Sequence, residues 1–169
     1  MQVPDKYSKG KKVILKGRYS ERENIEKTKA ALGMIENIDE NVGKIIKTLK
    51  EIDKYEDTII IFLSDNGPNG NRWNNELKER KGSTNEGGVR VPFFIQWPNK
   101  IKSGIKIKQV TSVLDVFPTL TDLIDSPTGI NFDGKSFKKY IKNPDLLDNQ
   151  RKIFSFWNNR LSVRNNEYI

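Results

Sequence analysis

The spacing of apolar residues predicts one long amphipathic helix in the first third of the chain. From about residue 20 to residue 53, apolar residues recur at intervals of three and four, with charged residues between them. This spacing is typical of a helix that packs one face on a core. Ser20 and Glu23 have the spacing of a capping box at its start. The apolar face consists of Ala31, Met34, Ile35, Ile38, Val42, Ile45, Ile46, Leu49 and Ile52.

A buried strand is predicted directly after this helix, at residues 58–63, where an apolar run rich in isoleucine shows no alternation with polar residues. Such a run is typical of a strand buried on both faces of a parallel sheet. A helix followed at once by such a strand favours a layered α/β fold. The chain continues with an expected strand at 91–97, a short helix within 110–124, and a hairpin that turns at Asn158 and Asn159.

The end of the predicted strand carries the first candidate site, because Asp65 and Asn66 follow it immediately. In open α/β sheets, ligands bind just beyond the carboxyl ends of the strands. An anionic and a neutral oxygen ligand side by side suit a hard divalent cation such as Ca²⁺. Asn66-Gly67 is also a common hairpin turn, but nothing in 68–80 has the pattern of a returning strand. The pattern therefore favours a metal-dependent hydrolase of oxyanion esters.

The composition excludes several kinds of chemistry and says less about the fold. The 30 Lys and Arg against 22 Asp and Glu give a net charge of +8. The lysines are scattered among acidic residues, which predicts a solvated basic surface and no nucleic-acid partner. With no cysteine and no histidine, the chain has no disulfide, no thiolate ligand and none of the usual general acid or base. No stretch has the length of a membrane span, so no membrane partner is expected.

A second candidate group lies in the loop that follows Asn66. Lys81 beside Gly82 could contact an anionic ester as a point charge, although an exposed surface lysine is the simpler explanation for that residue taken alone. Position 76 is Glu where a phosphate-binding P-loop would need glycine, so no nucleotide site is predicted. Gly87 and Gly88 allow a tight turn into the strand at 91–97.

Taken together, these segments resemble the type I sulfatases, the arylsulfatase family of the alkaline-phosphatase-like superfamily. The similarity covers most of the chain. The segments that carry it are Ser64-Asp65-Asn66-Gly67, Arg72-Trp73-Asn74, Lys81-Gly82-Ser83-Thr84-Asn85-Glu86-Gly87-Gly88-Val89-Arg90-Val91-Pro92, Trp97-Pro98, Ile38-Asp39-Glu40-Asn41-Val42-Gly43, Asp115-Val116-Phe117-Pro118-Thr119-Leu120, Asp133-Gly134-Lys135-Ser136 and Ser162-Val163-Arg164.

The resemblance implies a partial alkaline-phosphatase-like α/β sandwich, with a mostly parallel sheet flanked by helices. Residues 1–145 would be the later part of the catalytic domain, and residues 146–169 the beginning of a small antiparallel C-terminal subdomain. Asp65 and Asn66 match two of the family's Ca²⁺ ligands, and Lys81 matches the lysine that contacts the sulfate of a sulfate-ester substrate. Glu86, Gly87, Gly88 and Arg90 match signature positions that we expect to shape the loop.

Several parts of the family's active site have no counterpart in these 169 residues. The family's nucleophile is a formylglycine made within a Cys/Ser-x-Pro-x-Arg motif, which is absent here. The paired acidic Ca²⁺ ligands near the family's N-terminus and its active-site histidines are also absent. We therefore expect the later part of a sulfatase, with an earlier N-terminal part missing or supplied separately, and no catalysis by the chain alone.

Two alternatives remain open at this point. The chain could be a non-catalytic module that binds an anion or Ca²⁺, or it could derive from a phosphonate or phosphodiester hydrolase of the same superfamily. The resemblance further implies a parent protein of a kind that bacteria often export to the periplasm or secrete.

Overall fold

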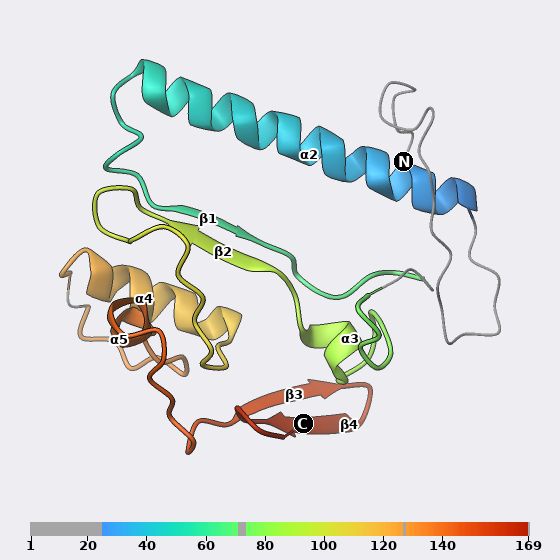
Figure 1. Ribbon diagram of the computed structural model, residues 1–169. Helices are drawn as coiled ribbons and strands as arrows, with labels where there is room; N and C mark the ends of the chain where they lie inside the picture. The colour runs from blue at the N-terminus through green and yellow to red at the C-terminus, as the bar shows by residue number, and fades with distance from the viewer. Residues whose placement is uncertain (1–24, 71–73, 127, 169) are drawn as a thin grey trace. The chain divides into compact units, whose positions relative to one another are not determined.

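The computed structural model describes residues 25–70, 74–126 and 128–168, and its helices and strands are shown in Figure 1. The chain divides into two compact units, residues 1–100 and residues 101–169, and each is described by itself. The proposed capping box at Ser20 and Glu23 and the Arg72-Trp73 part of the family motif lie outside the described residues. The expected domain boundary at residue 145 stays a prediction.

The predicted long helix is confirmed as α2, Ile25–Glu51. It ends because Asp53 takes a left-handed backbone conformation, with φ 54°, and the N–H of Lys54 returns to the carbonyl of Leu49 at 2.8 Å; this is the usual way to satisfy the last carbonyls of a helix. The predicted apolar face is covered only in part. Met34 and Val42 are half-buried, whereas Ile35 is 60% exposed. The expectation of a fully core-packed helix is therefore not met among the described residues.

The sheet described in unit 1 is a pair of short strands, β1 (Ile60–Leu63) and β2 (Phe93–Gln96). They run antiparallel, and Phe62 lies opposite Phe94. The prediction of a strand buried on both faces of a parallel sheet is wrong for the described residues, because β1 has one antiparallel neighbour and Phe62 is 42% exposed. An apolar run indicates that a strand is suited to burial, but it does not specify what covers it.

Unit 2 holds the buried apolar core of the described residues, which consists of Phe137, Tyr140 and Ile141. These residues belong to or border α5 (Lys138–Lys142), a short helix that the sequence pattern did not predict. It contacts α4 (Val116–Leu123), which follows the single 3₁₀ turn η1 (Val113–Asp115). The helix expected within 110–124 is thus present, with its first turn wound more tightly.

The predicted C-terminal hairpin is confirmed. Strand β3 (Ile153–Trp157) pairs antiparallel with β4 (Arg160–Arg164). The turn between them consists of Asn158 and Asn159, whose φ angles of 47° and 59° are those of a type I′ turn. Asparagine tolerates this left-handed conformation better than most residues. No helix in the described part of the chain is long and apolar enough to cross a membrane.

Candidate functional site

The end of β1 places Asp65 and Asn66 in a short irregular segment outside the sheet. Asp65 is exposed and Asn66 is half-buried. Ser64 fixes the segment, because its hydroxyl donates to the backbone carbonyl of Asn66 at 3.0 Å. The partner strand β2 begins at Phe93, far along the chain, so Asn66-Gly67 is not a two-residue hairpin turn. Of the two interpretations of this dipeptide, the structure excludes the turn.

Gly67 anchors this segment to the short helix α3 (Glu86–Val89), which precedes β2 (Figure 1). Its N–H donates to the carbonyl of Gly88 at 2.8 Å. A Cβ atom at Gly67 would lie 1.7 Å from the carbonyl oxygen of Gly87, which is far inside van der Waals contact. Glycine is therefore required for the two backbones to approach this closely.

The loop of Lys81 is attached to the same place. The N–H of Lys81 donates to the carbonyl of Pro68 at 3.1 Å, and the N–H of Gly87 donates to the carbonyl of Lys78 at 2.8 Å. The structure thus joins the backbone beside Asn66, the Lys81 loop and α3 into one cluster. Lys81 itself is exposed, and no bond of its side chain to the other described residues is seen.

The helical turn α3 was not predicted, because two glycines disfavour a helix. Its glycines pack directly on backbone. A Cβ atom at Gly87 would lie 1.9 Å from the carbonyl oxygen of Glu79, and one at Gly88 would lie 2.2 Å from that of Ser83. Glu86 is buried and forms an ion pair with Arg90 at 3.1 Å. These contacts agree with the loop-shaping role expected for the motif.

A calcium ion can be tested against the donors at the end of β1. Asp65 and Asn66 supply oxygen ligands, the kind that Ca²⁺ prefers, but Ca²⁺ takes about six to eight of them. No group of three or more acidic residues close enough to hold a metal occurs in the described part of the chain. The two residues therefore fit Ca²⁺ in kind and would form part of its coordination shell, which other groups must complete.

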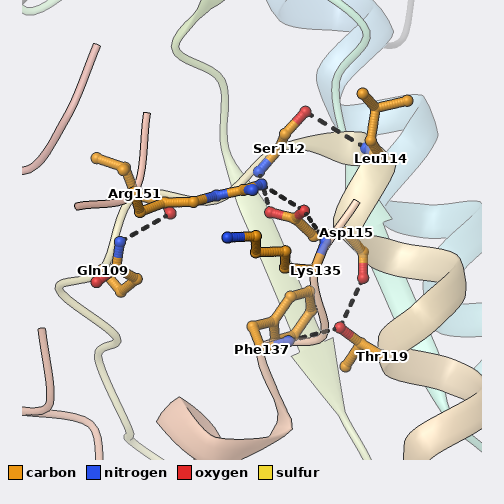
Figure 2. A network of polar contacts seen from close by, with 9 residues as sticks. Gln109, Ser112, Leu114, Asp115, Thr119, Lys135, Phe137 and Arg151 are labelled. Carbon is orange, nitrogen blue, oxygen red and sulfur yellow. Dashed lines mark hydrogen bonds and ion pairs between the residues drawn. The ribbon is translucent and has the colours of Figure 1, made fainter. Parts of the chain in front are cut away.

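A second polar cluster, in unit 2, surrounds Asp115 (Figure 2). The Asp115 carboxylate is 2% exposed. It accepts hydrogen bonds from the N–H groups of Ser112 and Lys135, at 2.8 and 2.7 Å, and forms an ion pair with Arg151 at 2.6 Å. Because these partners all belong to the protein itself, the carboxylate joins η1 to the 133–137 segment and to Arg151, just before β3.

Thr119 continues this cluster one helical turn later. Its hydroxyl donates to the carbonyl of Asp115 at 2.6 Å and accepts from the N–H of Phe137 at 2.9 Å. A Cβ atom at Gly134 would lie 1.9 Å from the carbonyl oxygen of Leu114. No individual role was expected for these positions from the sequence. The signal available was the Ser112 and Asp115 spacing of a capping box, which the structure contains.

Comparison with known proteins matches this chain to one family. A family model described as Sulfatase matches residues 2–126. Similar curated proteins include a steryl-sulfatase of Mus musculus (29% identical, covering 73% of this chain and 22% of that protein) and an arylsulfatase of Clostridium perfringens (33% identical, covering 82% and 29%). An N-acetylgalactosamine-6-sulfatase of Mus musculus is 31% identical, covering 75% of this chain and 26% of that protein.

The chain spans about a quarter of the length of the curated relatives that it matches. The matched segment includes the end of β1, the Lys81 loop and α3, together with all of α4. Because the family model covers well over half of these residues, the chain belongs to the sulfatase family.

Proposed function

We propose that this chain contributes part of the active site of a Ca²⁺-dependent sulfuric ester hydrolase. The observation that supports it is the backbone cluster that joins the end of β1 to the Lys81 loop, through the bonds from Gly67 to Gly88 and from Lys81 to Pro68. This cluster keeps two oxygen ligands and a cationic side chain on segments that are bonded to each other. A site for a metal ion and an anionic ester needs both kinds of group.

In the proposed site, Asp65 and Asn66 bind Ca²⁺ and Lys81 contacts the sulfate of the ester. A divalent cation bound there would stabilise negative charge that develops on the sulfate oxygens. Lys81 adds a second positive charge on a flexible stem, which suits contact with an anion. In the same proposal, residues 1–145 correspond to the later part of the catalytic domain and residues 146–169 to the start of the C-terminal subdomain.

The nucleophile and the general acid of the reaction are proposed to come from outside these 169 residues. The sequence contains no cysteine, no histidine and no Ser-x-Pro-x-Arg motif. We therefore expect no turnover of an aryl sulfate, an aryl phosphodiester or an aryl phosphonate when the chain is assayed alone with Ca²⁺. Turnover of any of them above the uncatalysed rate would show that this assignment of roles is wrong.

Calorimetry with Ca²⁺ tests the metal ligands without needing activity. We expect Asp65→Ala to weaken Ca²⁺ binding by about tenfold or more, because affinity depends on the number of charged ligands. Asp57→Ala is the matched control, since Asp57 is an exposed aspartate in the turn before β1. Equal Ca²⁺ affinities for the Asp65→Ala and Asp57→Ala chains would show that Asp65 is not a Ca²⁺ ligand.

A non-catalytic module that binds Ca²⁺ or an anion is the second candidate. It is favoured by the exposure of Asp65 and Lys81, whose side chains make no bond with other described residues. Ca²⁺ affinity tighter than millimolar in the isolated chain, lost in Asp65→Ala and accompanied by no turnover, would favour this candidate. Weaker Ca²⁺ binding would favour a site that is completed by further residues of a larger sulfatase.

A further inference from the structure

Glu79 and Ser83 form a side-chain contact across the loop that carries Lys81. The Ser83 hydroxyl donates to Oε2 of Glu79 and accepts from the N–H of Asn85 at 2.9 Å. Glu79 and Ser83 are both half-buried, whereas Lys81 is exposed. The contact therefore links the two ends of the loop 79–83, and Lys81 lies at its centre. We refer to it as the Glu79–Ser83 pair.

The backbone of Glu79 is held in an unfavourable conformation. Its φ angle is 64°, in the left-handed region that residues other than glycine rarely adopt. Its carbonyl accepts from the side chain of Asn74 at 3.0 Å and lies where a Cβ atom on Gly87 would clash with it. Strain of this kind persists only where neighbouring contacts hold it, and it is concentrated at functional sites.

Lys81 depends on this loop for its position. Its own N–H is bonded to Pro68, but its side chain makes no bond to other described residues. A lysine side chain loses rotamer freedom when it binds an anion. If the backbone beneath it were also free to move, binding would have to order the loop as well, and affinity would fall. A contact that already orders the loop removes that cost.

We propose that Glu79 and Ser83 are positioning residues that order the loop for anion binding by Lys81. This inference rests on the proposed function, because it takes Lys81 as the sulfate contact. The Glu79 carboxylate acts through the Ser83 hydroxyl and does not itself touch the sulfate. The charged acceptor makes the hydroxyl bond stronger than a neutral acceptor would.

The test uses the 169-residue chain, inorganic sulfate and mass spectrometry at low micromolar concentration. Hydrogen exchange of the peptide that spans 79–83, without sulfate, measures how well the loop is ordered. Acylation of Lys81 at increasing sulfate concentrations gives the concentration that half-protects it. The variants are Ser83→Ala, Ser83→Thr, which keeps the hydroxyl, and Glu79→Gln, which keeps an acceptor oxygen. Ser103→Ala, an exposed serine in unit 2, is the control.

We expect Ser83→Ala to speed exchange in the loop, and to raise the half-protecting sulfate concentration, by about threefold to tenfold, the range for losing one hydrogen bond. Glu79→Gln should give a smaller change in the same direction, because its acceptor is neutral. Ser83→Thr and Ser103→Ala should match the parent chain. Peptides from β2 report whether each variant keeps its fold. If exchange in the β2 peptides changes in Ser83→Ala, the result for Glu79→Gln tests the positioning role instead.

Different results would refute the positioning role of Glu79 and Ser83 and the sulfate contact of Lys81. Unchanged loop exchange or unchanged sulfate protection in Ser83→Ala, while the parent chain binds sulfate, would refute the positioning role. A loss of loop order and sulfate protection in Ser83→Thr as large as in Ser83→Ala would also refute the positioning role, because the retained hydroxyl should preserve the contact with Glu79. If sulfate fails to protect Lys81 in the parent chain, the assignment of Lys81 as the sulfate contact is refuted, and the positioning role, which rests on it, is refuted as well.

Discussion

Three glycines hold the backbones of the candidate site in direct contact. The carbonyl of Gly87 lies where a side chain on Gly67 would have to be, and Gly87 and Gly88 pack in the same way against the loop before them. No other residue type lacks a Cβ atom. The glycines of the family motif are therefore explained at residue scale by close approach, since none of the three requires a positive φ angle.

Replacing Gly67 tests this explanation. We expect Gly67→Ala to lower the free energy of unfolding by about 1–3 kcal/mol, the usual cost of forcing an extra methyl group into a packed position. Gly43→Ala is the control: Gly43 lies within α2 with open space around its Cα, so alanine should stabilise by up to about 1 kcal/mol. Urea unfolding measures both. Equal effects of the two substitutions would contradict the packing explanation.

Asp115 gives a second prediction at residue scale. Asp115→Ala should destabilise unit 2 by about 3–5 kcal/mol, because it leaves the charge of Arg151 buried without its partner. Asp145→Ala is the matched control. Asp145 also forms an ion pair, and its side-chain hydrogen bond with Lys108, followed by the charge of Lys108, lowers its pKa, but both groups are exposed. Solvent screens that pair, so no measurable loss is expected. Thermal unfolding that ranks the two variants alike would contradict the account.

The β3–β4 hairpin is an element whose turn residues decide its stability. Asn159 has φ 59°, a conformation that costs an alanine about 1–2 kcal/mol. We expect Asn159→Ala to lower the melting temperature of unit 2 and Asn159→Gly to keep or raise it, because glycine adopts this conformation freely. Calorimetry of the two variants checks the order. A higher melting temperature for Asn159→Ala than for Asn159→Gly would count against the type I′ turn.

The elements differ in how far the sequence could predict them. The long helix and the hairpin carry local signals, namely the three-and-four spacing of α2 and the Asn158-Asn159 pair, and both are confirmed. The neighbours of β1 are set by distant residues, so its antiparallel pairing with β2 could not be inferred from an apolar run. The helical turn α3 depends on contacts with Gly67 and with the loop that precedes it. Its two glycines disfavour a helix, so the sequence did not predict it.

The candidate site shows the same division. The positions of Asp65, Asn66 and Lys81 were found from residue type and from the resemblance, and their roles stay predictions. The backbone bonds that bring their segments together, and the contact between Glu79 and Ser83, depend on three-dimensional packing. Neither the residue types of Glu79 and Ser83 nor their spacing in the sequence indicates a site.

At the scale of the whole molecule, exposed aromatic side chains predict self-association. Phe94 on β2 is 65% exposed, and Phe154 and Phe156 on β3 are 64% and 70% exposed. Short sheets with open apolar edges favour pairing between chains. We expect sedimentation velocity to show a mass that rises with concentration, and Phe94→Lys to reduce that rise. A single monomeric species at every concentration would contradict this prediction.

In the proposed site, the end of β1 and the Lys81 loop together bind a cation and a sulfate. Coupling between the two ligands tests it most directly, because a cation and an anion that share a site strengthen each other's binding reciprocally. The measurement is sulfate affinity of the 169-residue chain with and without Ca²⁺. We expect tighter sulfate binding with Ca²⁺, and loss of this gain in Asp65→Ala and in Lys81→Ala. Sulfate affinity that is the same with and without Ca²⁺, and the same in both variants, would contradict it.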